Sequence, residues 1–160
     1  MARITKDEYY LGIALAVSKR STCIKRHYGC VIVKDDIIIA TGYNGSVRGE
    51  ENCCDRGTCK RANAERYSCY ENCDSVHAEQ NAIISASRKD MLNGTLYLVG
   101  INYNDNTYVQ NANPCSLCKK MIINAGLKQV IVRDTKESFR IIDIQDFIDN
   151  DESLEESKGY

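Results

Sequence analysis

The sequence contains no hydrophobic run that approaches the roughly 18 apolar residues needed to cross a bilayer. It also lacks the pattern of a secretory leader, because Lys6, Asp7 and Glu8 interrupt the first apolar residues and no cleavage pattern follows. There is no internal repeat and no linker between domains. We therefore expect a cytoplasmic protein without membrane attachment, in which residues 1–160 form a single domain.

An excess of either charge is missing as well. The 21 basic and 22 acidic residues give a formal net charge of −1. Such a chain has no general attraction for nucleic acid, so a long DNA or RNA partner is not expected. A small anionic substrate is compatible with this balance, because it needs only one or two local cations.

Proline occurs once, at Pro114, where it suits the first residue of a helix that ends near Ala125 with Gly126 as its C-cap. Apolar spacing predicts another helix over residues 5–19, with Thr5 as cap and Tyr9, Ile13, Ala16 and Val17 on one face. The remaining expected elements are two strands at 30–33 and 37–41 joined by a hairpin turn at Asp35-Asp36, strands at 96–99 and 129–132, a helix at 77–87 capped by Asp74 or Ser75, and a short strand or helix at 141–148. This alternation indicates an α/β fold with a central sheet between helices.

Cysteine, in contrast, is abundant, with nine residues. In a reducing compartment these thiols point to metal binding or catalysis rather than to disulfides. Five of them lie in an irregular, polar insert at about 46–76 that is poor in large aliphatic residues. Because such a segment cannot fold by apolar burial alone, a structural metal would stabilise it. The acidic tail from about 149 is expected to fray.

Two short segments carry the chemistry, His77-Ala78-Glu79 and Pro114-Cys115-Ser116-Leu117-Cys118. Alone, a histidine at a helix start is more often a cap, and two cysteines three apart are as readily a redox pair. Together they offer one nitrogen and two thiolates. On a helix, Cys115 and Cys118 share one face, and the unpaired backbone N–H groups of a first turn favour thiolates.

Three protein ligands leave the fourth position of a tetrahedral zinc ion open to water, which is typical of a catalytic site. Zinc lowers the pKa of this water toward about 7. Glu79, two residues beyond His77, is placed to act on that water as a base without being a ligand.

This pattern resembles the signature of the zinc nucleobase deaminases. Further blocks resemble the deoxycytidylate (dCMP) deaminase family, from about residue 5 to residue 133. These blocks are Ser21-Thr22-Cys23, Thr41-Gly42-Tyr43-Asn44-Gly45, Arg48-Gly49, residues 76–83, residues 114–118 and residues 121–126.

The resemblance implies a three-layer α/β/α sandwich with a mixed five-stranded sheet. It implies a hydrolase of pyrimidine deoxynucleotide metabolism that converts dCMP to dUMP and ammonia, with zinc held by His77, Cys115 and Cys118. Glu79 would pass a proton from the water to ring N3 and then to the leaving amine. It also implies a homo-oligomer, often a hexamer, with allosteric control by dCTP and dTTP in many members.

Substrate contacts can also be proposed, the first by analogy with the family's Gly-Tyr-Asn-Gly loop and the second from the chemistry of arginine. Asn44 would bind the sugar, although an asparagine at this point also suits a left-handed turn. Arg26 would meet the 5′-phosphate, with a solvated surface arginine as the alternative. Lys25, Arg48 and Arg133 are weaker candidates for the phosphate.

A second, structural zinc is implied by some family members. Its expected ligands are Cys23, Cys53, Cys59 and Cys73, with Cys54 and Cys69 as substitutes. The alternative is a set of free thiols on a loop. Cys30, within an apolar strand, is expected to be a small buried side chain.

Two departures from the family pattern lie near the expected substrate: a long segment at 101–113 and Val132 in place of an aromatic residue. They leave open a zinc deaminase of another nucleoside, nucleotide or heterocycle. A different class of protein, a non-catalytic zinc-binding interaction module, is also compatible with the ligands. The presence of Glu79 favours the enzyme, because a structural site needs no carboxylate there.

Overall fold

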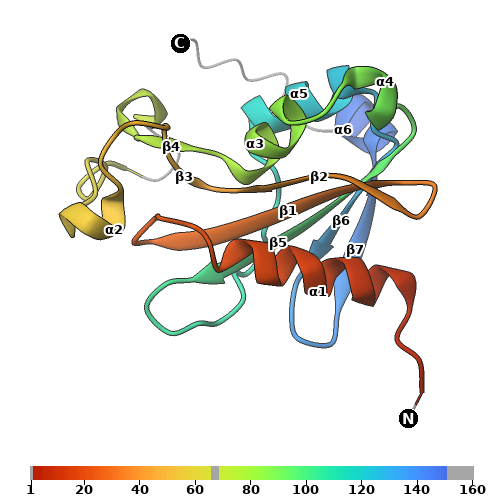
Figure 1. Cartoon of the computed structure of the whole chain (residues 1–160), viewed down its shortest axis with the longest axis horizontal. Coiled ribbons are helices and arrows are strands. Elements are labelled where there is room, and N and C mark those ends of the chain that lie inside the picture. Colours follow the sequence, from red (N-terminus) through yellow and green to blue (C-terminus); the bar gives the residue numbers. More distant parts are fainter. Residues whose placement is uncertain (1, 66–68, 151–160) are drawn as a thin grey trace.

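The computed structural model describes residues 2–65 and 69–150, and its centre is a five-stranded mixed sheet with helices on both faces (Figure 1). Strands β5 and β6 run parallel, and the other neighbouring strands run antiparallel. The predicted three-layer α/β/α fold is therefore confirmed. In the order β2-β1-β5-β6-β7, the strands are Ile37–Tyr43, Arg26–Lys34, Thr95–Asn102, Gln129–Arg133 and Phe139–Asp143.

The first two strands form the predicted hairpin. Asp35 and Asp36 have φ values of 51° and 61°, the left-handed conformation that a two-residue hairpin turn requires at both positions. Beyond the turn, Val33 pairs with Ile38 and Ile32 pairs with Ala40, so Ile39 is an extra residue on β2. This β-bulge locally bends the edge strand of the sheet.

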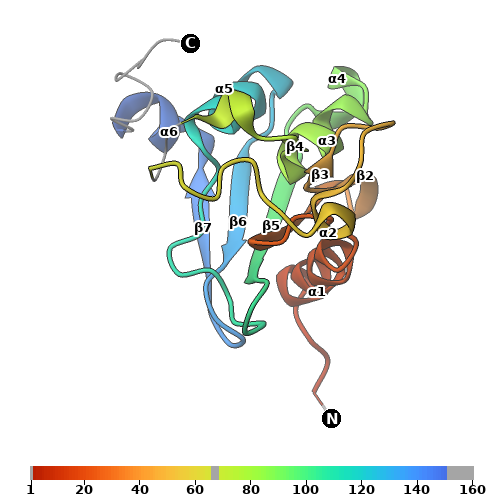
Figure 2. The ribbon, with the colours of Figure 1, turned by 90° about the vertical axis from the view of Figure 1, so that its left-hand side faces the viewer.

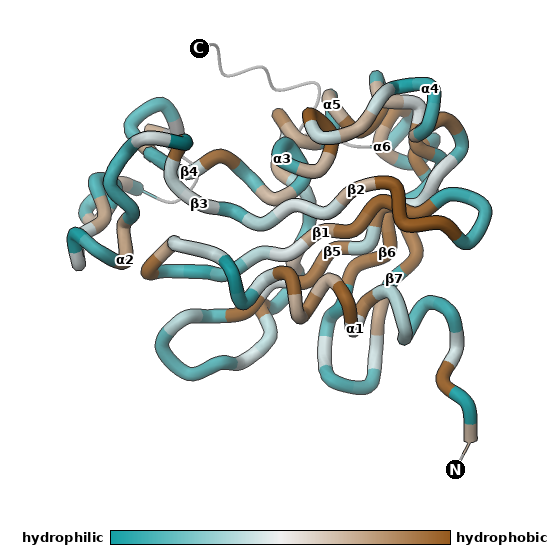
Figure 3. Tube along the Cα trace, viewed as in Figure 1, coloured by the Kyte–Doolittle hydropathy of each residue, from teal (hydrophilic) through white to brown (hydrophobic). Residues whose placement is uncertain are grey.

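Alternation along β1 divides the core between the two faces of the sheet. Cys30 and Ile32 point to one face, whereas Val31 and Val33 point to the other. Helix α1 (Lys6–Ser18) covers the second face, and four other helices cover the first (Figure 2). The most apolar part of the trace lies in these central strands (Figure 3). The helices of the first face are α3 (Ala78–Ile84), α4 (Arg88–Met91), α5 (Ser116–Ala125) and α6 (Ile144–Asn150).

Helix α1 begins as predicted but buries a different face. The hydroxyl of Thr5 accepts a hydrogen bond from the backbone of Glu8 at 3.2 Å. The expected inner residue Tyr9 is 51% exposed. Apolar residues lie on nearly every side of this helix, so its pattern does not select one face, and packing on the sheet decides. The residues actually buried are Tyr10, Leu11, Ala14 and Ser18.

Two helix starts on the other face differ from the prediction by one or more residues. Helix α3 has His77 itself as N-cap, not Asp74 or Ser75, and the His77 carbonyl accepts from the Asn81 backbone at 3.0 Å. Helix α5 has Cys115 as N-cap, so Pro114 lies just outside it. Gly126 ends α5 in the left-handed conformation, φ 79°, as predicted. Residues 141–148, expected to be strand or helix, contain the end of β7 and most of α6.

The described residues of the insert, 46–65 and 69–76, lie at one end of the sheet (Figure 1). The two ends of the insert are joined by a two-stranded antiparallel ribbon, in which β3 (Gly45–Ser46) pairs with β4 (Ser75–Val76). Between them lie the short helix α2 (Cys53–Arg56) and a 3-10 turn, Tyr70–Asn72. Residues 149–150 of the expected frayed tail belong to α6, and residues 151–160 lie outside the described part. Within that part, every helix is too short or too polar to span a bilayer.

Candidate metal centre and active site

His77, Cys115 and Cys118 meet where the first turns of α3 and α5 approach each other. The Nδ1 atom of His77 lies 3.5 Å from the Cys115 sulfur and 3.4 Å from the Cys118 sulfur. The ligand atoms of all three residues lie within 4.8 Å of one another. Among the residues that the structure describes, this is the one group of three or more His, Cys, Asp or Glu side chains gathered so closely.

These spacings fit a tetrahedral zinc ion. Zn–S bonds of about 2.3 Å and Zn–N bonds of about 2.0–2.1 Å give a sulfur-to-nitrogen edge of about 3.5–3.6 Å. Both measured distances lie close to this edge. Two thiolates and an imidazole are also the donor types that zinc prefers, and three ligands leave one position free.

The two thiols behave as a coupled pair. The Cys118 thiol donates to the Cys115 sulfur and, with His77 beside it, lowers the pKa of Cys115 to about 4. Sharing this proton, together with burial, raises the pKa of Cys118. The Cys115 thiolate in turn raises the pKa of His77. The pair therefore loses one proton readily and retains the second, which a divalent cation would displace.

Glu79 lies beside this cluster and is buried. Its side chain is only 5% exposed, and burial raises the pKa of its carboxyl group. Cys30, fully buried on β1 as expected, interacts electrostatically with it. A carboxyl group that changes protonation closer to neutral pH can both accept and return a proton, which is the property required of a general acid–base.

Asn44 lies close to the cluster through the β3–β4 ribbon. Gly45, the residue after Asn44, pairs with Val76, the residue before His77. The Asn44 side chain is held by β1: its oxygen accepts from the Tyr28 backbone at 2.7 Å and its nitrogen donates to the Arg26 carbonyl at 2.9 Å. Within the described part of the chain, one N–H and one lone pair of this amide remain for a ligand.

The cationic candidates are placed differently. Arg26 is exposed at the start of β1, and its backbone carbonyl accepts the hydrogen bond from the Asn44 side chain. Lys25 uses its ammonium group to donate to the Arg61 carbonyl at 2.8 Å. Arg133 is buried and forms an ion pair with Glu8 on the α1 side of the sheet, at 2.6 Å. This pairing removes Arg133 from the candidates for a phosphate contact.

The cysteines expected to hold a second zinc are more widely spaced than the first cluster. Among the described residues, no three of their sulfur atoms lie within 4.8 Å of one another. All are free thiols, and Cys53 is the buried one. The pKa of Cys53 is raised, mainly by burial, with smaller contributions from Cys23 and Cys59. Cys23 and Cys59 therefore lie near enough to Cys53 to act on its thiol electrostatically. Helix α2 is tied to the Cys23 segment, because the Cys54 backbone donates to the Thr22 carbonyl at 3.0 Å.

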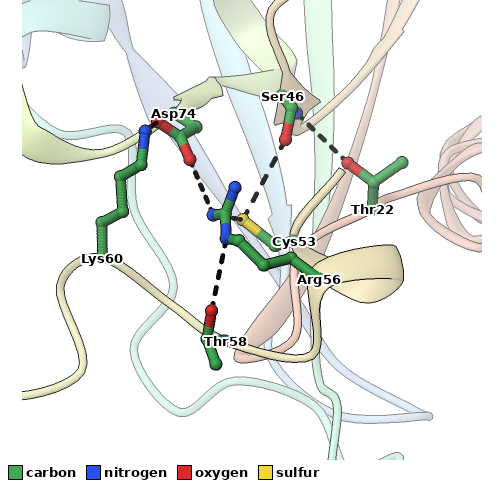
Figure 4. Close-up of polar contacts among 7 residues, drawn as sticks. All are labelled: Thr22, Ser46, Cys53, Arg56, Thr58, Lys60 and Asp74. Carbon is green, nitrogen blue, oxygen red and sulfur yellow. Dashed lines mark hydrogen bonds and ion pairs between the residues drawn. The ribbon is translucent and has the colours of Figure 1, made fainter. Parts of the chain in front are cut away.

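Asp74 anchors the insert three residues before His77 (Figure 4). One of its oxygens binds the Arg56 guanidinium and the other binds the Lys60 ammonium, both at 2.7 Å. These two cations lower the pKa of the Asp74 carboxyl group. Arg56 also donates to the Cys53 sulfur at 3.6 Å. A single carboxylate thus connects α2 and the following loop to the strand that leads into the metal cluster.

Two supporting residues are not marked by the sequence motifs. The Gln80 side chain accepts from the His77 backbone at 2.9 Å, a contact that the capping position of Gln80 three residues after His77 would have indicated. Arg140 on β7 donates to the Ala112 carbonyl and binds Asp134. It thereby fixes the end of the long 101–113 segment just before Cys115, and no local sequence signal reveals that contact.

Comparison with protein families gives one extended match. Residues 4–134 match the family model described as the cytidine and deoxycytidylate deaminase zinc-binding region. A deoxycytidylate deaminase of Schizosaccharomyces pombe is 38% identical over 128 residues, which are 78% of this chain but 36% of the yeast protein. The chain therefore spans little more than a third of that relative.

Two phage proteins are similar over nearly their whole length. The deoxycytidylate deaminase of Mycobacterium phage D29 is 34% identical over 138 residues, 82% of this chain and 96% of the phage protein. The dCMP deaminase of cyanophage S-TIM5, solved in complex with dCMP and dUMP, superposes with a TM-score of 0.61 and 26% identity. That alignment covers 95% of both chains.

Proposed function

The chain belongs to the cytidine and deoxycytidylate deaminase family, and we propose that it hydrolyses dCMP to dUMP and ammonia with the aid of zinc. The observation that carries this proposal is the cluster of His77, Cys115 and Cys118 at zinc-like spacing, with a buried carboxyl group, Glu79, beside it. A purely structural zinc site has four protein ligands and needs no acid–base group.

In the proposed reaction His77, Cys115 and Cys118 hold the metal. Zinc bound there would lower the pKa of a water molecule at its open position and make it nucleophilic at neutral pH. Glu79 accepts a proton as oxygen attacks C4 of the cytosine ring and delivers it to N3. It then takes the proton of the new C4 hydroxyl group and passes it to the amine as the C4–N bond breaks and the C4 carbonyl forms, so that water and dCMP yield dUMP and ammonia.

Substrate placement is proposed for two further residues. The remaining N–H and lone pair of the Asn44 amide suit a sugar hydroxyl, and Asn44 directly precedes the Gly45–Val76 pair that leads to His77. Arg26, exposed nearby, suits the 5′-phosphate. The alternative, another nucleoside, nucleotide or heterocycle as substrate, is favoured by no specific contact among the described residues.

A substrate panel tests this function. Ammonia release is measured with the zinc-loaded chain on dCMP, CMP, deoxycytidine and dCTP, and we expect dCMP to give the highest kcat/KM. Turnover of deoxycytidine without turnover of dCMP would overturn the proposed substrate. No ammonia from any of the four would favour another base or a non-catalytic module.

We also propose that a second zinc stabilises the insert. The electrostatic influence of Cys23 and Cys59 on the Cys53 thiol supports this, with Cys73 as the proposed fourth ligand. Elemental analysis should give two zinc ions per chain, and one after Cys53→Ser. A wild-type content of one zinc contradicts the second site.

Assembly, regulation and location complete the proposal. Exposed Ile84 and Leu117, on α3 and α5, offer apolar surface for a homo-oligomer such as a hexamer. Sedimentation of the purified chain tests this, and dCMP titrations with and without dCTP and dTTP test regulation. Residues 1–160 would act as one domain in the cytoplasm, where thiol ligands stay reduced.

A further inference from the structure

Strand β2 and helix α3 touch through backbone rather than through side chains. At Gly42, an added methyl group would lie 2.2 Å from the Ala78 carbonyl oxygen and 2.5 Å from the Ala82 nitrogen. Gly42 lies within the regular strand, paired with Cys30, so the glycine serves no unusual backbone angle. What it provides is space, which lets the first turns of α3 rest directly on the strand.

A second contact fixes the same helix next to this one. The Asn81 side chain donates to the Tyr43 carbonyl at 2.8 Å, one residue after Gly42. Asn81 lies four residues after His77 and two after Glu79, and its backbone donates to the His77 carbonyl at 3.0 Å. Gly42 therefore sets how deeply the helix sits on β2, and Asn81 sets its position along the strand.

We propose that Gly42 and Asn81 are positioning residues of the active site, an inference that rests on the deaminase function proposed above. The metal ligands come from two separate helices: His77 caps α3, whereas Cys115 and Cys118 belong to the start of α5. The seating of α3 on β2 thus decides where His77 Nδ1 and the Glu79 carboxyl group lie relative to the two sulfurs.

The expected effect is large for so small a change. To bring a methyl group at position 42 to ordinary contact, α3 must move away by roughly 1 Å. A displacement of about 1 Å in an active site can cost about a hundredfold in rate. Loss of supporting contacts around a metal site typically weakens metal binding about 10- to 100-fold.

The same sheet supplies a matched control on its opposite face. A methyl group at Gly29 would lie 2.0 Å from the Ala14 carbonyl oxygen and 2.4 Å from the Ser18 nitrogen. Gly29→Ala therefore disturbs α1 as severely as Gly42→Ala disturbs α3. Helix α1, however, carries no ligand of the cluster, so the two substitutions differ in which helix they displace and not in their local strain.

The experiment compares Gly42→Ala, Gly29→Ala and Asn81→Ala in the full chain, with kcat and KM for dCMP measured on zinc-saturated protein. Metal affinity is measured independently by titrating metal-free protein with Co²⁺ and following the visible absorption band that disappears in His77→Ala. For Gly42→Ala we expect kcat to fall about 30- to 100-fold with KM changed less than about threefold, and Co²⁺ to bind about tenfold more weakly. For Gly29→Ala we expect both kinetic constants within about twofold of wild type.

Asn81→Ala adds no bulk and tests the same idea if Gly42→Ala does not fold; we expect its kcat to fall about three- to tenfold. Equal losses in Gly42→Ala and Gly29→Ala would overturn the proposal, as would a rise in KM at unchanged kcat, which would make this segment a substrate contact. A wild-type chain without deaminase activity would refute the proposed function alone. The Co²⁺ titration would still decide whether Gly42 and Asn81 position the metal ligands.

Discussion

Glu8 in α1 and Arg133 at the end of β6 form a bidentate ion pair, although they are 125 positions apart in the sequence. The guanidinium nitrogens of Arg133 lie 2.6 Å and 3.2 Å from the two Glu8 oxygens. The Arg133 side chain is 6% exposed, whereas Glu8 is 31% exposed. Since a buried cation needs its partner, this pair fastens α1 to the sheet.

The first prediction concerns this pair. Glu8→Gln should lower the free energy of unfolding by about 1–2 kcal/mol at pH 7, because it leaves the Arg133 charge buried with a neutral partner. Arg133 lowers the pKa of Glu8 below its ordinary 4.5. The stabilisation is therefore present above that value and is lost as the pH falls through the lowered pKa.

Urea unfolding at a series of pH values measures both effects. The difference between wild type and Glu8→Gln should shrink as the pH falls from about 5 toward 3. The control is Lys6→Ala, which removes an ion pair with Asp36 whose side chains are 67% and 56% exposed; its effect should stay below about 0.5 kcal/mol. A pH-independent difference for Glu8→Gln would contradict the assignment.

A second prediction separates catalysis from metal binding. Glu79→Gln keeps the shape of the side chain but cannot carry a proton between water, ring and amine, so kcat should fall by at least about a thousandfold. Zinc content should stay at the wild-type value, because Glu79 is not among the three clustered ligands. Unchanged turnover in this variant would favour the non-catalytic module.

The lowered pKa of Cys115 gives a third prediction, for the metal-free protein. With a pKa of about 4, Cys115 is already a thiolate at neutral pH, so its alkylation by iodoacetamide should change little between about pH 8 and pH 6. Zinc should protect it. Mass spectrometry of the modified peptides gives the rate at each site.

Cys54 is the internal control for that measurement. Cys54 is exposed to solvent. Partial desolvation of its thiol, together with the neighbouring Asp55 carboxylate, raises the pKa of Cys54 above the ordinary value of 9. Its alkylation should therefore slow about tenfold for each pH unit below that value. If Cys115 shows the same steep dependence, the thiol pair is not coupled as the geometry indicates.

The fourth prediction concerns the anchor of the insert. Asp74→Asn removes the charge that holds Arg56 and Lys60, so trypsin should cleave after these residues several-fold faster. Asp55→Asn is the matched control, because Asp55 is exposed on the same helix as Arg56 and its side chain bonds to Asn52 instead. Equal cleavage rates in the two variants would show that Asp74 does not restrain the insert.

The sequence is sufficient to predict the sheet, the first hairpin and the grouping of His77, Cys115 and Cys118. These features have local signals: a two-residue Asp-Asp turn, a proline before a helix, and ligands spaced three residues apart on one helix. Cys115 and Cys118 can be recognised because their spacing alone places them on one face. The comparisons confirm the predicted family, which the blocks around Gly42, His77 and Pro114 indicate.

What the sequence cannot predict depends on contacts between distant segments. From the sequence alone, Arg133 is a reasonable candidate for a phosphate contact, because no neighbouring residue in the sequence reveals its ion pair with Glu8. The predicted inner face of α1 is wrong because that helix is apolar on several sides. The packing role of Gly42 has no local signal, since its contact with Ala78 and Ala82 exists only once α3 has docked.

The bulge at Ile39 has a consequence for the protein in concentrated solution. Strand β2 is an edge strand with Ile37 and Ile38 exposed, and a flat edge of this kind invites strand-by-strand aggregation with other molecules. The extra residue breaks the regular spacing of its free N–H and C=O groups. A strand from another molecule could then form hydrogen bonds with only part of this edge. The bulge therefore limits aggregation at an edge whose exposed apolar side chains would otherwise favour it.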